Sequence, residues 1–417
     1  MSGRHVHGCD TLNIRSLARA VTTLLALATA PTLMAQQAGQ DEVVAARARD
    51  LHARAIVVDT HDDTTQRMVV EPSFDLGAKG ATGSIDLPRM REGGLDALFF
   101  SIFVPRDVTG PQAVERALQQ IDKVREAARL HPRELALATS ATEIRRAAAE
   151  RKIAALLGME GGHMIDGDLG VLRQYAALGV RYLTLTHSLN TTWADSSGDT
   201  AVHNGLTPFG KDVVRELNRL GVMVDVSHVS DKTFYDTLAT TTVPVIASHS
   251  SCRAISNSPR NMTDDMLRAL ARNGGAIMIN YNAGFLSEAF RTAKAPAGVQ
   301  ARLDAATKRC GADEACALLE WGPIYHEAMR NGQLPAVTWV EIVDHIEHAV
   351  KVAGIDHVGL GSDFDGAIMP LGMEDVSTLP RITGELLKRG HSEQDVTKIL
   401  GGNLLRVMEQ VELGRGR

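Results

Sequence analysis

Seven residues of this chain carry side chains that ligate metals or transfer protons, and each follows an apolar run. Histidine nitrogens and carboxylate oxygens suit Zn²⁺ or a similar divalent ion, and no cysteine belongs to the set. There are more of them than one tetrahedral ion needs, which favours two ions with a carboxylate between them. The seven are His61, Asp63, Glu160, His187, His228, His249 and Asp363.

The first pair of this set follows the apolar run at residues 56–58. Such a run predicts a buried parallel strand, because these strands are apolar on both faces. His61 and Asp63 are two residues apart, so in an extended segment they point to the same side, and Asp62 points away. Alone, the pair suits a polar turn as well as a metal site. The five other residues favour the metal site.

Eight apolar runs separated by helical patterns predict the elements that position these residues. Strands are expected at residues 56–58, 97–103, 153–158, 182–186, 222–227, 243–248, 276–281 and 357–361. Helices are expected at 40–55, 113–130, 141–152, 169–178, 208–220, 232–239, 264–273 and 339–353. This alternation predicts an α/β fold, a (β/α)8 TIM barrel whose strand ends converge on one face. A doubly wound open sheet is the alternative, but the first strand-to-helix turn has no Gly-rich phosphate loop.

The composition excludes some classes of function. The chain has 417 residues, of which 44% are hydrophobic and 23% charged, as expected for a globular enzyme with a sizeable core. Its formal net charge is -6, which is not the basic balance of a nucleic-acid binder. Only 4% of the residues are aromatic, so a platform for stacked bases is not expected either.

Residues 1–35 have the pattern of a secretory signal peptide: three arginines, an apolar run at 20–30 and a small-residue cleavage site before residue 36. The alternative is an N-terminal membrane anchor, but the apolar run is short for a membrane span. The mature chain, 36–417, is expected to be one barrel domain with a mostly helical insertion at about 282–334. A periplasmic or secreted location follows from the signal.

The other cysteine and histidine residues considered are predicted to have structural or surface positions. Cys310 and Cys316 are close in sequence, and in an exported protein they are expected to form a local disulfide. A metal site is the alternative, but no further ligand gathers around them. Cys252 is expected to be a buried thiol. His345 and His348 lie in a helical stretch with acidic neighbours and are expected at the surface.

The chain resembles the membrane (renal) dipeptidases, which belong to the binuclear zinc branch of the amidohydrolase superfamily. The resemblance covers essentially the whole mature chain, and its segments are specific jointly rather than singly. They lie at residues 58–63 (VDTHDD), 158–163 (GMEGGH), 181–190 (RYLTLTHSLN), 225–228 (DVSH), 248–251 (SHSS), 258–261 (SPRN) and 361–366 (GSDFDG).

The resemblance implies a ligand set for two Zn²⁺ ions. His61, Asp63 and Glu160 match the residues that hold one zinc. Glu160, His228 and His249 match those that hold the other, so Glu160 bridges the two ions.

The resemblance also implies three residues that act on the substrate. His187 contacts it near the scissile carbonyl, and Arg260 grips the free carboxylate of a dipeptide. Asp363 is the acid/base residue beside the bridging water. The implied activity is hydrolysis of dipeptides through a metal-bridging hydroxide, in a binuclear zinc metallopeptidase. Relatives also open β-lactam rings, so a side activity of that kind is expected.

Two other functions are kept as alternatives. One is a different amidohydrolase-type enzyme, such as a cyclic amidase, lactonase or deaminase. Many of those enzymes use His-x-His and a modified lysine, whereas this chain has His-x-Asp and Glu160. The other is a periplasmic zinc-binding protein without catalysis. The chain ends without the hydrophobic tail of lipid-anchored animal relatives, so no stable membrane anchor is expected. A homodimer is the candidate assembly.

Overall fold

The structure is a computed structural model that describes residues 42–71, 73–311 and 313–416. The predicted signal peptide, 1–35, therefore lies outside the described residues. Among the helices of the described part, none is both long and apolar enough to cross a bilayer.

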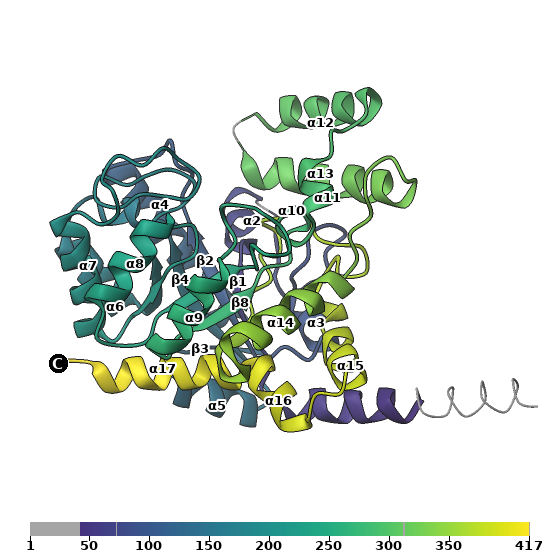
Figure 1. The fold of residues 1–417 in the computed structure, drawn as a ribbon, viewed down its shortest axis with the longest axis horizontal. Helices are drawn as coiled ribbons and strands as arrows, with labels where there is room; N and C mark the ends of the chain where they lie inside the picture. The colour runs from purple at the N-terminus through teal and green to yellow at the C-terminus, as the bar shows by residue number, and fades with distance from the viewer. Residues whose placement is uncertain (1–41, 72, 312, 417) are drawn as a thin grey trace, which may run out of the picture.

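Eight parallel strands form a nearly closed barrel, which confirms the predicted fold class (Figure 1). In the barrel they follow the order β1-β2-β4-β5-β6-β7-β8-β9, and a parallel bridge between Asp62 and Phe364 links the last strand region back to β1. A short extra strand, β3, pairs with β4 and was not predicted. The strands are β1 Val58–Asp62, β2 Ala97–Phe103, β3 Leu135–Leu137, β4 Ile153–Glu160, β5 Val180–Thr184, β6 Met223–Asp225, β7 Ile246–Ser250, β8 Ala276–Ile279 and β9 Val358–Leu360.

Helices connect successive strands, as the sequence pattern predicts. Residues 42–54 are helical, and the helices from α2 to α9 are Thr64–Val70, Leu87–Glu92, Pro111–Leu130, Ala141–Ala149, Leu169–Leu178, Pro208–Leu220, Asp231–Thr240 and Asp264–Asn273. The helices from α14 to α17 are Val340–Ala353, Pro380–Lys388, Glu393–Thr397 and Asn403–Gly414, with a π-helical turn, η4, at Lys398–Gly402. Three 3-10 turns, η1 to η3, lie at Gly162–Ile165, Ile355–His357 and Val376–Thr378.

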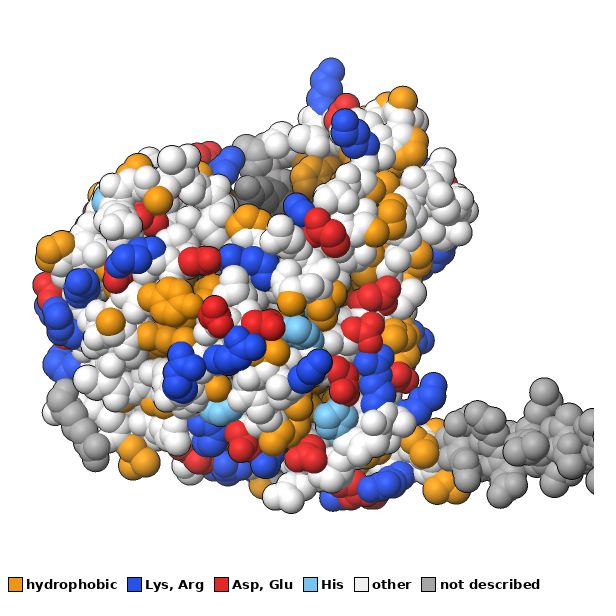
Figure 2. Space-filling view, viewed as in Figure 1, with side chains coloured by type: hydrophobic (Ala, Val, Ile, Leu, Met, Phe, Trp, Pro, Cys, Tyr) orange, Lys and Arg blue, Asp and Glu red, His pale blue; other side chains and the backbone are white. Residues whose placement is uncertain are grey.

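The segment between β8 and α14 is mostly helical, as expected. It contains α10 (Ala283–Leu286), α11 (Glu288–Thr292), α12 (Ala297–Cys310) and α13 (Glu314–Arg330). Figure 1 shows α12 and α13 stacked one above the other, with α12 farther from the strands. The same two helices form an arm that rises from the body of the molecule in Figure 2.

Some strand ends and the burial of one histidine were predicted wrongly. β4 and β7 end two residues later than predicted, so Glu160 and His249 lie inside strands instead of after them. The first strand begins at Val58 and continues to Asp62, so His61 lies inside the strand instead of after it. His345 is fully buried, because its two ring nitrogens bond the backbone N–H of Cys252 and the backbone oxygen of Leu286. Acidic neighbours on a helix predict a solvent-exposed face, but His345 faces the barrel.

The barrel interior is close-packed around Gly361, directly after β9. The Oγ1 of Thr60 donates to the backbone oxygens of Ser248 and Leu360, which draws three strand ends together at this point. A Cβ at Gly361 would overlap the backbone oxygen of Ser248. That oxygen is fixed by its strand, so the space cannot open by rotation of a side chain.

We therefore expect Gly361→Ala to lower the free energy of unfolding by about 1–3 kcal/mol, the usual cost of overpacking a core. Urea denaturation followed by circular dichroism measures this change. Gly298→Ala is the matched control, because a Cβ at Gly298 in α12 meets no atom within 4 Å. The control should be neutral or slightly stabilising, and equal losses in both variants would contradict the packing argument.

Candidate metal centre

The strand ends bring all seven predicted residues to one place. His61 and His249 lie in the last part of β1 and β7, Glu160 is the last residue of β4, and Asp63 directly follows β1. The other three are each the third residue after a strand: His187 after β5, His228 after β6 and Asp363 after β9. Because parallel strands end at the same face of a barrel, these side chains meet.

Glu160 is at the centre of the group, and its two carboxylate oxygens face different partners. Oε1 lies 2.9 Å from Nε2 of His228 and 3.1 Å from Nε2 of His249. Oε2 lies 3.3 Å from Nε2 of His61, which is in turn 3.6 Å from Oδ2 of Asp63. A carboxylate placed in this way has one oxygen for each of two ligand sets.

The described residues contain three groups whose ligand atoms all lie within 4.8 Å of one another and could hold a metal ion. They are His61 with Glu160 and His249; Glu160 with His187 and His228; and His61 with Asp63 and Asp363. Every one of the seven predicted residues belongs to at least one group. The grouping differs in detail from the two triads expected from the resemblance, since His61 and His249 also stack, with ring centroids 3.7 Å apart.

The tautomer of His61 follows from its buried neighbours. Its Nδ1 lies 2.8 Å from the hydroxyl of Tyr182, and that hydroxyl donates to the backbone oxygen of Thr60 at 3.1 Å. A phenol has a single proton, so Nδ1 of His61 must be the donor to Tyr182. In the neutral ring, Nε2 then carries no proton and presents its lone pair to Glu160.

The same argument applies to His249. Its Nδ1 lies 2.7 Å from Oγ of Ser248, which donates to Oδ2 of Asp225 at 2.6 Å. Oδ2 of Asp225 also accepts from Thr184, and Oδ1 accepts from the backbone N–H groups of Ser227 and Ser248. Asp225 therefore holds His249 through Ser248. Nε2 of His249 is again left without a proton.

This arrangement fits a bound divalent cation. Unprotonated imidazole nitrogens that face a carboxylate repel it, and a cation between them turns the repulsion into coordination. Nε2 of His61, Oδ1 of Asp63 and Nδ1 of His228 are buried without any hydrogen-bond partner. Burial works against a charge on Glu160, but imidazoles that carry a proton, His61 foremost, hold the pKa of its carboxyl well below the ordinary value. A cation bound in place of those protons favours the charged carboxylate in the same way. The carboxylate is thus ionised and ready to bind a metal.

Asp363 lies beside this group in a distinct environment. Burial raises the pKa of Asp363 to about 8; His61 opposes the rise, and the carboxylates of Asp63 and Glu160 add to it. Oδ2 of Asp363 accepts a hydrogen bond of 2.9 Å from the side-chain amide of Asn280. The φ angle of Asp363 is 65°, a conformation that is costly for a residue other than glycine and that is often found at functional sites.

Arg260 and His187 lie at the edge of the same cavity. One guanidinium nitrogen of Arg260, Nη2, donates to the backbone oxygen of His249 at 3.1 Å, while Nε is buried without a partner. The guanidinium also lies over the ring of Phe285, 5.3 Å from its centroid. Burial lowers the pKa of His187 to about 4, so this imidazole is neutral at pH 7.

The cavity has a volume of about 200 Å³. Its lining includes residues that the sequence reasoning did not select: Gln66, Phe103, Asn282, Phe285, Ala315, Leu318 and Gly366. Asn280, which bonds Asp363, directly follows β8 and carries the same strand-end signal as the selected residues. Ala315 and Leu318 belong to α13, far from any strand end, and no signal in the sequence marks them.

Asp365 and His163 are neighbours of the ligand residues that belong to none of the three ligand groups. Oδ1 of Asp365 accepts from the backbone N–H of Ser84 at 2.7 Å, and Oδ2 accepts from the hydroxyl of Thr64 at 2.8 Å. Asp365 thus ties the loop at Ser84 and the start of α2 to the segment that carries Asp363. His163 bonds the backbone oxygen of Val104 at 3.1 Å and belongs to none of the three ligand groups.

Known proteins resemble this chain in sequence and in structure. Dipeptidase 3 of Rattus norvegicus is 37% identical over 336 residues, which cover 79% of this chain and 59% of the rat protein. The chain therefore spans less than two thirds of that relative. The crystal structure of the probable dipeptidase PvdM from Pseudomonas aeruginosa superimposes with a TM-score of 0.75 at 28% identity, covering 89% of this chain and 99% of that one.

A second solved structure is a metallopeptidase from Rhodobacter sphaeroides liganded with a phosphinate mimic of the dipeptide L-Ala-D-Ala. It superimposes with a TM-score of 0.71 at 27% identity over 86% of this chain and 99% of that one. The sequence profile described as Membrane dipeptidase (Peptidase family M19) matches residues 45–416. The chain therefore belongs to the membrane dipeptidase family, peptidase family M19.

Proposed function

We propose that this protein is a binuclear zinc dipeptidase. The observation that carries the proposal is the position of Glu160, whose two oxygens divide the ligands into a set with His61 and Asp63 and a set with His228 and His249. Membership of the dipeptidase family supports it. So does the likeness to the Rhodobacter enzyme, which was crystallised with a dipeptide mimic.

The ligand set has the chemistry that Zn²⁺ prefers, with imidazole and carboxylate donors and no thiolate. Two bound Zn²⁺ ions would lower the pKa of a water molecule and polarise the scissile carbonyl. Tyr182 and Ser248 fix the ring planes and the tautomers of His61 and His249, as supporting residues do in other metal sites.

Asp363 is the acid/base residue in this proposal. Its raised pKa, about 8, allows both protonation states near neutral pH. Because Oδ2 accepts from Asn280, Oδ1 is the atom that takes a proton from water and returns it to the leaving amine. His187, neutral at pH 7, lies against Phe103 at 4.5 Å between ring centroids and can donate a hydrogen bond to a developing oxyanion.

Arg260 binds the free carboxylate of the dipeptide. A guanidinium has five N–H donors in a planar fork, and here Nε has no protein partner. In a dipeptide this carboxylate stands at a fixed distance from the only peptide bond. The arginine therefore selects for a free carboxylate beside the scissile bond.

The disulfide between Cys310 and Cys316 supports the proposed periplasmic or secreted location, since disulfides persist in oxidising compartments. It also confirms the predicted pairing, and Cys252 is buried as expected. The β-lactam side activity and the homodimer stay predictions.

The zinc ligands are tested by a matched pair of substitutions. Asp63→Asn removes a charged ligand, and we expect the variant to bind one zinc at least about tenfold more weakly than the unchanged protein. Asp62→Asn is the control, because Asp62 is also buried but accepts from the backbone N–H of Thr64 and belongs to no ligand group. Zinc titration against a chromophoric chelator measures both. Equal losses would mean that the metal lies elsewhere.

Substitution of Asp363 distinguishes an enzyme from a protein that only binds zinc. We expect Asp363→Asn to retain two zinc ions per chain and to lose about 10²–10⁴-fold in kcat for L-Ala-L-Ala, because proton transfer is lost while the ligands stay. Elemental analysis and amine release give the two readouts. A protein that only binds zinc would show no dipeptide hydrolysis before or after the change.

Carboxylate recognition by Arg260 predicts a difference between two substrates. We expect Arg260→Met to lower kcat/KM for L-Ala-L-Ala about tenfold to hundredfold, the equivalent of one charged hydrogen bond of roughly 1.5–3 kcal/mol. The dipeptide amide has no carboxylate, so its slow hydrolysis should change little. Proportional losses on both substrates, with zinc retained, would assign Arg260 to the chemical step instead.

A further inference from the structure

The catalytic cavity is not enclosed by the barrel alone. Three of the five expected ligands and Arg260 line it, and so do Ala315 and Leu318, which come from α13 of the helical insertion. Both side chains are apolar, as are Phe103 at the end of β2 and Phe285 in α10, which line the same cavity. The part of the cavity that α13 borders therefore suits an apolar substrate group and not the charged ends of a dipeptide.

Leu318 in α13 borders three cavities at once. It lines the catalytic cavity, a second cavity of about 520 Å³ beside Arg106 and Trp321, and a third of about 320 Å³ beside Ser84 and Met369. The first and second cavities share no other lining residue, and the first and third share only one more, Asp365. The half-buried side chain of Leu318 thus separates a small catalytic cavity from two larger spaces.

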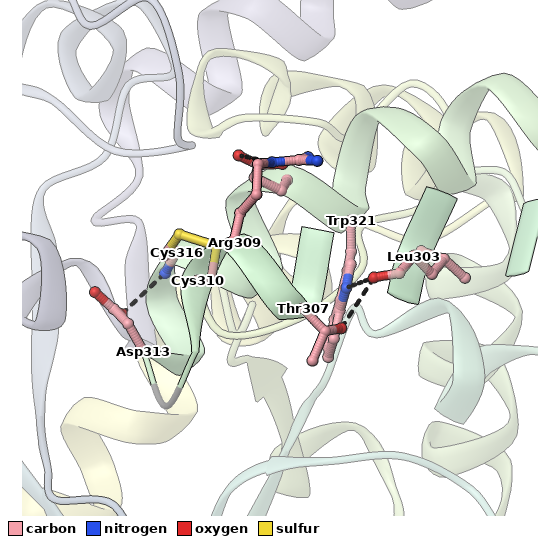
Figure 3. The surroundings of a disulfide bond; sticks show 8 residues. Leu303, Thr307, Arg309, Cys310, Asp313, Cys316 and Trp321 are labelled. Atoms are coloured by element: carbon pink, nitrogen blue, oxygen red, sulfur yellow. Dashed lines mark hydrogen bonds and ion pairs between the residues drawn. A yellow bond between two sulfur atoms is a disulfide. The ribbon is translucent and has the colours of Figure 1, made fainter. Parts of the chain in front are cut away.

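The helix that carries Leu318 is fixed at both ends. At its start, the disulfide joins Cys316 to Cys310 at the end of α12, and Asp313 accepts from the backbone N–H of Cys316 at 3.0 Å (Figure 3). Farther along, Trp321 donates to the backbone oxygen of Leu303 in α12 at 3.4 Å, as Figure 3 also shows.

The other end of α13 is held against the loop that follows β9. His326 lies within 2.9 Å of the backbone oxygen of Met369, and Arg330 forms an ion pair of 2.8 Å with Glu374. The start of α13 is thus held by α12, and its other end is held by the loop after β9. These contacts favour a fixed position for the side chains of α13 that border the cavity.

We propose that Leu318 sets the size limit for a substrate side chain. The enzyme accordingly prefers dipeptides with small apolar side chains over those with large ones. This inference rests on the proposed dipeptidase function and specifies the substrate class of that site. Removal of the isobutyl group joins the catalytic cavity to its neighbours, which gives a large side chain room without any change in the ligands.

The test compares kcat/KM for two series of dipeptides, Ala-X and X-Ala, with Ala, Leu or Phe at X. In the unchanged protein we expect Ala-Ala to be the best substrate. Leu318→Ala should raise the Phe-to-Ala ratio of kcat/KM by about tenfold or more in at least one series, within the range that a hydrophobic pocket can discriminate. Leu318→Phe should lower the same ratio.

Leu319→Ala is the matched control. Leu319 is the next residue of α13, is also half-buried and lines only the third cavity, so its loss should leave the ratio unchanged. Zinc content and the thermal unfolding midpoint are measured for all variants. An equal ratio in Leu318→Ala and Leu319→Ala in both series, with Ala-Ala still hydrolysed, overturns the inference and leaves the dipeptidase proposal standing. Failure of the zinc-loaded unchanged protein to cleave any dipeptide overturns both.

Discussion

A single buried carboxylate, that of Glu160, governs the arrangement of the whole site. Taking a carboxylate out of water costs several kcal/mol unless charged or hydrogen-bonding partners surround it. Here three imidazoles approach its two oxygens within 2.9–3.3 Å, and Ser101 donates to Oε2 at 3.2 Å. The partners come from β1, β2 and β7 and from the loop after β6. Only a closed ring of strands delivers groups so far apart in sequence to one point.

This crowding constrains the imidazoles in turn. Nε2 of His228 and Nε2 of His249 lie 2.9 Å apart, a distance at which both cannot carry a proton. The hydroxyl groups of Tyr182 and Ser248 contact Nδ1 of His61 and of His249, and these contacts set the tautomers of the two rings. The fold therefore specifies which nitrogen is available as well as where the ring lies. Gly158 takes part in this, because a Cβ there would overlap the ring of Tyr182.

Sequence reasoning could predict the barrel and the seven polar residues because both follow from one rule. Apolar runs of a parallel barrel end at a common face, so a polar residue after each run has a defined place. In the folded chain the rule also covers Asn280, which directly follows β8 and bonds Asp363, but the predicted strand at 276–281 extended past it. It could not predict the burial of His345, because local charge on a helix does not reveal which face meets the barrel.

The rule fails altogether for residues that reach the site from an insertion. Ala315 and Leu318 lie on an amphipathic helix whose sequence would suit any apolar contact, and only the folded chain shows that this contact is the catalytic cavity. The barrel and α13 therefore meet two different requirements of an enzyme, a fixed set of ligands and a cavity of suitable shape. The barrel strands fix the ligands through buried hydrogen bonds that tolerate little change, whereas α13 is attached by a disulfide, a few ion pairs and apolar contacts. Substitutions on that helix can alter the shape of the cavity while Glu160 and its partners stay in place.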